Sequence, residues 1–156
     1  MRLCSILPSG SVVVDAGGSL VHDKDEALHV VAGLLSSALG TEAGEVERML
    51  RDREALQSTG IGDGVAIPHA AMSGVNGRAA ALVLCPRGVE FSSIDGAPAR
   101  IILGVVGPKE GTGDHLRILA RVSKLLRDPA LRQQLLQSAT PGEAYQLLEN
   151  RDAALP

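Results

Sequence analysis

Two short aliphatic segments in the middle of this sequence restrict the folds that are open to it. Residues 79–85 and 100–106 are rich in Val, Ile and Leu and are bounded by Pro and Gly. This is the pattern of strands that are buried in a sheet. Residues 93–96 (Ser-Ile-Asp-Gly) are predicted to form the turn between them. The two strands can be parallel, or they can form a hairpin or meander.

Amphipathic helical patterns precede and follow these strands. Apolar residues recur at three- and four-residue steps, with acidic residues at the start of the first helix and Gly40 at its end. Helices are predicted at residues 23–39, 42–56, 114–126 and 129–136, and from the Thr-Pro-Gly-Glu capping box at residues 140–143 onward. Helices that alternate with strands, without repeats or a linker, predict an α/β layered fold for residues 1–156 as a single domain.

The composition excludes several classes of function. One Tyr, one Phe and no Trp leave almost no rings for stacking on bases, and a net charge of −3 gives no basic field for nucleic acid or acidic membranes. Cys4 and Cys85 form no C-x-x-C pair and are expected to be reduced thiols. No apolar run has the length of a membrane span, and the N-terminus lacks a secretion signal. We therefore expect a cytoplasmic protein without membrane insertion.

A glycine-rich loop leads to the most informative histidine. Gly60, Gly62 and Gly64 indicate unusual backbone dihedrals or close backbone approach, and a Val-Ala-Ile strand follows them. Pro68 then fixes the backbone before His69, whose imidazole is both a nucleophile and a proton carrier near neutral pH. On these grounds alone, a structural histidine remains the simpler interpretation. The loop matches neither the dinucleotide nor the Walker fingerprint, although its N–H groups suit a small anion.

The remaining histidines divide into two groups. His22 and His29 lie seven residues apart around the first helix, a spacing that does not suit metal ligands, and we expect a solvated pair. The prediction is therefore no metal and no cofactor. His115 lies near the N-terminus of the helix over 114–126, where Asp114 is the expected cap.

Three stretches of this sequence resemble the fructose/mannitol class of phosphotransferase-system enzyme IIA domains, and most closely their nitrogen-regulatory branch. They are Arg-Glu-Ala-Leu-Gln-Ser-Thr-Gly-Ile-Gly-Asp-Gly-Val-Ala-Ile-Pro-His over 53–69, Gly-Val-Glu-Phe-Ser-Ser-Ile-Asp-Gly-Ala-Pro over 88–98, and residues 114–128. The resemblance covers most of the chain. It implies a mixed five-stranded sheet with helices on both faces.

The resemblance also implies roles for individual residues. His69 would accept a phosphoryl group from an HPr-type phosphohistidine carrier, with His115 as the supporting histidine and Arg53 as the motif arginine. No stand-alone turnover is implied. One departure is that nitrogen-branch relatives commonly carry Gly and Lys after the active histidine, where this chain has Ala70 and Ala71.

The roles implied for the three residues agree with their chemistry. Phosphoryl transfer needs an aligned nucleophile and fixed positive partners. Arg53 offers a planar charged fork, and His115 offers an N–H at a helix N-terminus, although a solvated charge and a packing histidine are the plain alternatives. The other cations near the motifs are expected to be solvated, with a share in docking an acidic partner: Arg78, Arg87, Lys109 and Arg117.

The leading hypothesis is a bacterial phosphocarrier that regulates a target protein through its phospho-state. The alternatives are a sugar-uptake IIA protein that passes phosphate to a IIB partner, and an interaction module that binds partners irrespective of phosphate. The last is favoured by Ala71 and opposed by the joint presence of Arg53, His69 and His115. A domain that binds a small anion at the 60–64 loop would explain neither histidine.

Overall fold

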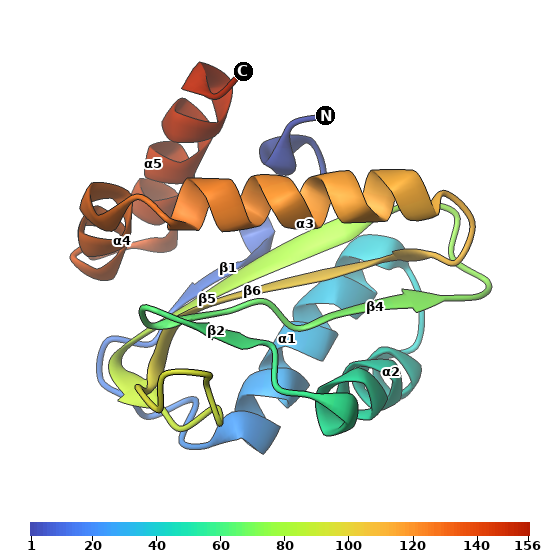
Figure 1. Cartoon of the computed structure of the whole chain (residues 1–156), viewed down its shortest axis with the longest axis horizontal. Helices are drawn as coiled ribbons and strands as arrows, with labels where there is room; N and C mark the ends of the chain where they lie inside the picture. The colour runs from blue at the N-terminus through green and yellow to red at the C-terminus, as the bar shows by residue number, and fades with distance from the viewer.

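A computed structural model describes residues 1–156, and it places a mixed sheet between two layers of helices (Figure 1). The strands are β1 (Val12–Val14), β2 (Gly60–Gly62), β3 (Val65–Ala66), β4 (His69–Met72), β5 (Ala79–Val89) and β6 (Ala99–Pro108). The helices are α1 (Lys24–Leu39), α2 (Ala43–Leu56), α3 (Thr112–Leu126), α4 (Pro129–Leu136) and α5 (Pro141–Ala154). Two short 3₁₀ turns, Leu3–Ser5 and Ser9–Ser11, precede β1. The predicted α/β layered fold is confirmed.

The sheet is built around the long antiparallel pair β5 and β6. Its order is β1-β5-β6-β3-β2, and β4 also pairs with β6. Both β3 and β4 run parallel to β6, β1 runs parallel to β5, and β2 runs antiparallel to β3. The hairpin alternative for the two aliphatic strands is therefore correct. The sheet has six strands, where the resemblance implied five, because the chain pairs with β6 again beyond Pro68.

The sheet is buried on both faces, which explains the uninterrupted aliphatic strands. One core of 21 buried residues lies between the sheet and α1 and α2, and a second of 19 lies beneath α3, α4 and α5. Side chains alternate between them along β4 and β6, so that Ala70 and Val106 join the first core and Val105 joins the second. It follows that His69 and Ala71 face α3.

Two of the helix ends that the sequence predicted are confirmed, and one is not. Gly40 adopts a left-handed conformation at the end of α1 (φ 66°), and the side chain of Thr140 caps α5. The prediction that Asp114 caps α3 was wrong. The helix begins at Thr112 after Gly111, whose φ of 77° suits glycine, and Asp114 lies in the first turn, where it pairs with Arg117.

None of the five helices is long and apolar enough to cross a membrane.

Candidate functional site around His69 and His115

The glycine loop brings the β2–β3 hairpin close to the segment before β6. A Cβ on Gly60 would lie 2.3 Å from Oγ of Ser93, so that only glycine fits there. Gly62 and Gly64 have φ values of 96° and 78°, which other residues rarely adopt. Both expectations for this loop, unusual dihedrals and close approach, are confirmed. The tight hairpin fixes β3 against β6, and the chain leaves β3 through Pro68 directly into His69.

His69 is half-buried at the first position of β4 and faces α3. Its Nδ1 lies 2.7 Å from the carbonyl oxygen of Ile67. A carbonyl only accepts hydrogen bonds, so Nδ1 carries the proton and donates it, and the lone pair of the neutral ring is on Nε2. Burial lowers the pKa of His69, and the charge of Arg53 lowers it further, against the opposing effects of Ile67 and Glu54. The ring is therefore a neutral nucleophile at pH 7.

His115 lies in the first turn of α3, with its ring centroid 5.9 Å from that of His69 and the two ring planes inclined at 54°. Its Nδ1 is buried and has no hydrogen-bond partner. A neutral imidazole avoids a buried, unpaired N–H when its proton is on Nε2. Burial lowers the pKa of His115, and the nearby His69 and Arg78 lower it further. His115 thus presents a neutral ring with Nε2–H as its donor.

Arg53 lies in the last turn of α2, on the approach to His69 and His115. Its Nη1 donates to the carbonyl oxygen of Gln57, 2.9 Å away, at the C-terminus of α2. A cation is favourable at this end of a helix. Because the charge of Arg53 also lowers the pKa of His69, its field reaches the nucleophile. The structure therefore brings together all three residues that the sequence singled out.

Glu54 is a buried charge near the end of α2. Its carboxylate accepts hydrogen bonds from the backbone N–H and hydroxyl of Thr59 and pairs with Lys24 at 2.7 Å. Burial alone would raise the pKa of Glu54, but the bonds from Lys24 and Thr59 hold it below its usual value. Glu54 joins α2 and α1 to the start of the glycine loop and so fixes the approach to His69.

The expectation that Arg78 is a solvated surface cation was wrong. Its side chain is half-buried against Gly107, and Nε is buried without a hydrogen-bond partner. Gly107 has no side chain, which leaves the space that the guanidinium of Arg78 occupies. Sequence offers no signal for this burial, because it does not show that Arg78 lies over Gly107. Lys109 and Arg117 are exposed as expected.

Comparison with known proteins assigns this geometry to a family. Residues 11–151 match the family described as phosphoenolpyruvate-dependent sugar phosphotransferase system, EIIA 2. The chain belongs to this EIIA type 2 family. A nitrogen regulatory protein of Pseudomonas aeruginosa is 31% identical over 149 residues, which covers 95% of this chain and 95% of that relative. The resemblance noted in the sequence is thereby confirmed.

Solved structures of EIIA proteins agree with the fold. The crystal structure of the nitrogen regulatory protein IIA-Ntr from Neisseria meningitidis aligns with a TM-score of 0.84 at 29% identity, covering 92% of this chain and 97% of that one. The complex of enzyme IIA mannitol with phosphorylated enzyme IIB mannitol from Escherichia coli aligns with a TM-score of 0.75 at 20% identity, covering 92% and 96%.

The other polar clusters of this EIIA protein lie apart from the His69 site. His22 pairs with Glu26, and His29 pairs with Glu47. The structure contains no group of three His, Cys, Asp or Glu residues placed to hold a metal ion.

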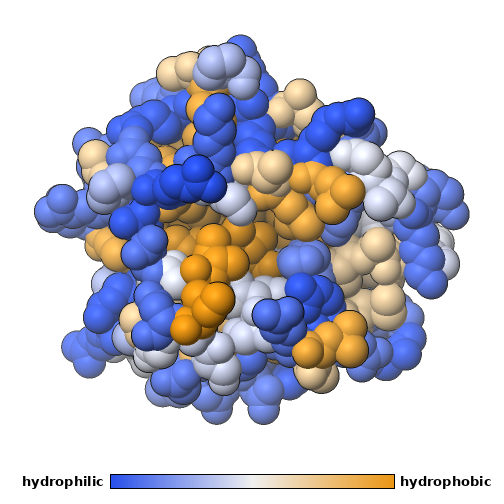
Figure 2. All heavy atoms as spheres, in the orientation of Figure 1, coloured by the Kyte–Doolittle hydropathy of each residue, from blue (hydrophilic) through white to orange (hydrophobic).

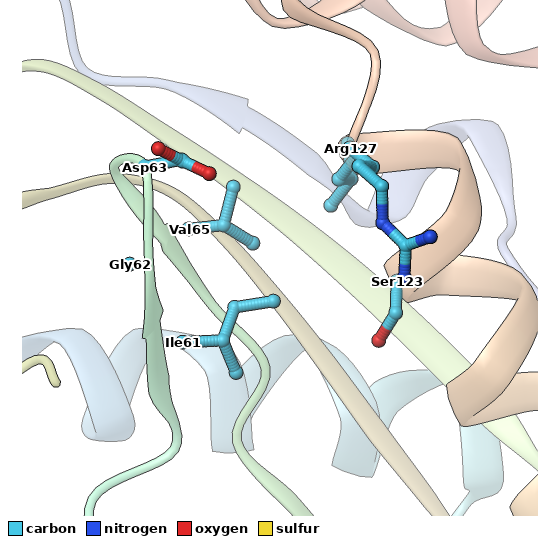
Figure 3. A pocket seen from close by; sticks show the side chains of 7 residues that line it. Ile61, Gly62, Asp63, Val65, Ser123 and Arg127 are labelled. Atoms are coloured by element: carbon cyan, nitrogen blue, oxygen red, sulfur yellow. The ribbon is translucent and has the colours of Figure 1, made fainter.

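A pocket of about 320 Å³ opens between the β2–β3 hairpin and the C-terminal part of α3 (Figure 3). Ile61 and Val65 lie on one side of it, and Ser123 and Arg127 lie on the other. None of Arg53, His69 and His115 lines it. The histidine pair is therefore separate from this pocket.

Proposed function

We propose that this EIIA protein is a phosphocarrier that accepts a phosphoryl group on Nε2 of His69 and signals or relays its phospho-state. The observation that carries the proposal is the hydrogen bond between Nδ1 of His69 and the carbonyl of Ile67. That bond fixes the tautomer and the ring orientation, which leaves one nitrogen as the nucleophile. The proposal takes residues 1–156 as one EIIA domain.

The transfer moves a phosphoryl group between two imidazole nitrogens. Nε2 of His69 attacks the phosphorus of a donor phosphohistidine, and a new N–P bond forms as the donor's N–P bond breaks. The electron pair of the broken bond returns to the donor's ring nitrogen. The proton on Nδ1 of His69 stays with its bond to Ile67, so no separate general base is required.

His115 and Arg53 supply the fixed positive partners that a loose phosphoryl transition state requires. The ring of His115 lies 5.9 Å from that of His69 between centroids, and its Nε2–H is the donor available to an equatorial phosphoryl oxygen. The first turn of α3 adds its unpaired N–H groups and partial positive charge to the same space. Arg53 adds a permanent charge from the opposite side.

Exposed apolar side chains around the site support a protein as the donor. Leu116 follows His115 and is 61% exposed, and Leu56, just before the residue that binds Arg53, is 82% exposed. Ile61 and Ile94 line a hollow of about 300 Å³ next to Gln57. Figure 2 shows hydrophobic atoms near the middle of this face and hydrophilic ones around its rim. Such a surface fits a protein of the HPr class.

The downstream acceptor separates two candidate functions. The nitrogen regulatory relative aligns with this chain over nearly its whole length, which supports a regulator whose target reads the phospho-state. The solved mannitol relative forms a complex with phosphorylated IIB, which supports a sugar-uptake role as the second candidate. Both functions use the same first step at His69.

The first step is tested by incubating the protein with phosphoenolpyruvate, enzyme I and HPr-type carriers and measuring its intact mass. We expect one added phosphoryl group that is labile in acid and stable in alkali, because a phosphoramidate nitrogen is readily protonated. His69→Ala should remove the added mass, whereas His29→Ala, a change at an exposed histidine, should not. Equal labelling of the His69→Ala protein would overturn the proposal.

A further inference from the structure

Arg78 is the only arginine in the protein with a buried, unpaired side-chain nitrogen. Its Nη2 makes one long hydrogen bond, 3.4 Å, to the carbonyl oxygen of Gly111, and no carboxylate pairs with it. By contrast, Arg48, Arg51, Arg117, Arg121 and Arg151 all form ion pairs with Asp or Glu. A half-buried charge without a counter-ion costs free energy unless an anion arrives to pair with it.

The register of the sheet places this charge on the same face as His69. Ala71 on β4 pairs with Gly107 on β6, and a Cβ on Gly107 would lie 2.7 Å from Nε of Arg78. The guanidinium thus covers Gly107 on the face of the sheet toward α3, which is the face that His69 occupies. His69 itself pairs with Val105, two residues before Gly107. Arg78 precedes β5, on the opposite side of β6 from β4, so its backbone lies about two strand spacings from that of His69, and its side chain extends over Gly107 on the strand between them.

Arg78 is also linked to the supporting histidine. The carbonyl of Gly111 that it contacts accepts the backbone N–H of His115 at 3.2 Å, in the first turn of α3. The positive charge of Arg78 contributes to the lowered pKa of His115. The guanidinium of Arg78 and the imidazoles of His69 and His115 therefore lie on the same face of the sheet, near the start of α3.

We propose that Arg78 is a further phosphate-stabilising residue of this protein, and that its guanidinium is the counter-ion of the phosphoryl group on His69. This inference rests on the proposed function. A phosphoryl group brings up to two negative charges, and the methyl side chain of Ala71 supplies no cation to meet them. The planar fork of arginine matches phosphoryl oxygens, and its long side chain crosses the space over Gly107 to reach them.

The test measures the equilibrium of phosphoryl exchange between HPr-type carrier and protein, by intact mass, for the unmodified chain and three variants. Arg78→Gln removes the charge, Arg78→Lys keeps it, and Arg87→Gln removes an exposed charge from the far end of β5 as the matched control. We expect Arg78→Gln to shift the equilibrium toward the carrier by about 10- to 100-fold, the effect of one charge-assisted hydrogen bond. Arg78→Lys should keep most of the occupancy, and Arg87→Gln should match the unmodified chain.

Each result has a single interpretation. If Arg78→Gln slows the forward and reverse transfers equally and leaves the equilibrium unchanged, Arg78 acts in carrier docking and the inference is wrong. If the unmodified chain takes up no phosphoryl group, the proposed function and this inference fail together. Thermal unfolding checks that Arg78→Gln is folded, and Arg78→Met, with a similar side-chain length and no charge, replaces it if it is not.

Discussion

Nδ1 of His69 donates a 2.7 Å hydrogen bond to the carbonyl oxygen of Ile67, two residues earlier in the chain. The bond joins the nucleophile to the backbone that leaves β3, so the ring orientation depends on main-chain geometry. It also occupies one of the two nitrogens at which a histidine can be phosphorylated. In the proposed reaction, a neighbouring peptide group thus sets which nitrogen of His69 is phosphorylated.

We therefore predict that the phosphoryl group resides on Nε2 of His69 and not on Nδ1. Phosphorylation at Nδ1 would require the loss of the Ile67 bond and rotation of a half-buried ring. Nitrogen-15 and phosphorus-31 NMR of the phosphorylated protein distinguishes the two isomers. A signal from the Nδ1 isomer would contradict the assigned tautomer.

The second prediction concerns the groups beside the nucleophile. Arg53→Ala and His115→Ala should fold normally but slow transfer by about ten- to a thousandfold each, the range for single donors at a developing charge. Arg48→Ala is the control, because it removes an exposed arginine from the same helix as Arg53. Stopped-flow or quenched transfer assays measure the rates. If both variants transferred phosphate at the unmodified rate, Arg53 would be only a charge at a helix end and His115 only a packing histidine.

Helix ends and buried strands could be predicted from the sequence because their causes are local. Gly40 and the capping box at Thr140 end and begin helices through contacts within a few residues. The sequences of β5 and β6 are nearly uninterrupted aliphatic runs, and this composition indicates strands that are buried on both faces. Asp114 misled the prediction because Gly111 begins α3 three residues earlier, through a left-handed conformation that sequence does not display.

The short strands and the unpaired arginine could not be predicted, because tertiary pairing produces them. β1 and β4 are short strands that exist only through their bonds to β5 and β6. Arg78 is half-buried because Gly107, on the neighbouring strand, has no side chain to displace it. The roles of His69 and His115 came from resemblance alone. The structure adds that the two ring centroids lie 5.9 Å apart, with the ring planes inclined at 54°.

The third prediction concerns pH and stability. The folded protein holds the pKa values of His69 and His115 below the ordinary value of about 6.5, chiefly through burial. Well above pH 6.5 neither state binds these protons. As the pH falls below 6.5, the unfolded chain binds protons that the folded protein rejects, so the free energy of unfolding decreases until the lowered pKa values are passed.

Urea unfolding at pH 7.5, 6.5 and 5.5 measures this loss. His115→Ala should lose less stability between pH 7.5 and 5.5 than the unmodified chain, because one of the two groups is absent. His29→Ala, which removes an exposed histidine, serves as the control. Equal losses in the His115→Ala and unmodified proteins would show that His115 titrates normally in the folded state.

The fourth prediction concerns the contact between α1 and the sheet. A Cβ on Gly104 of β6 would lie 2.3 Å from Cγ1 of Val31, a stiff, fully buried side chain of α1. Gly104→Ala should therefore lower the free energy of unfolding by about 1–3 kcal/mol. Gly33→Ala, in the same helix with open space around it, should raise it by up to about 1 kcal/mol. If Gly104→Ala left the free energy of unfolding unchanged, α1 would be able to move away from the sheet without an energetic cost.

The fifth prediction concerns how a partner reads the phospho-state. His69 is held by β4, Pro68 and the Ile67 carbonyl, so a phosphoryl group has little freedom to rearrange the surrounding fold. Its negative charge instead changes the potential of the exposed face around Leu116 and Ile61. The affinity of a target protein or IIB partner should then differ between the phosphorylated and unmodified forms by about 1–3 kcal/mol, the usual size of a coupling free energy.

Pull-down with both phospho-states, followed by calorimetric titration of any partner found, measures this difference. His69→Asp supplies a negative charge at the same position and should shift affinity in the same direction as phosphorylation. His69→Gln keeps the side chain uncharged and should bind like the unmodified form. A partner that binds all of these forms with equal affinity would show that the face docks proteins irrespective of phosphate, because a charge at His69 would then have no energetic coupling to the interface.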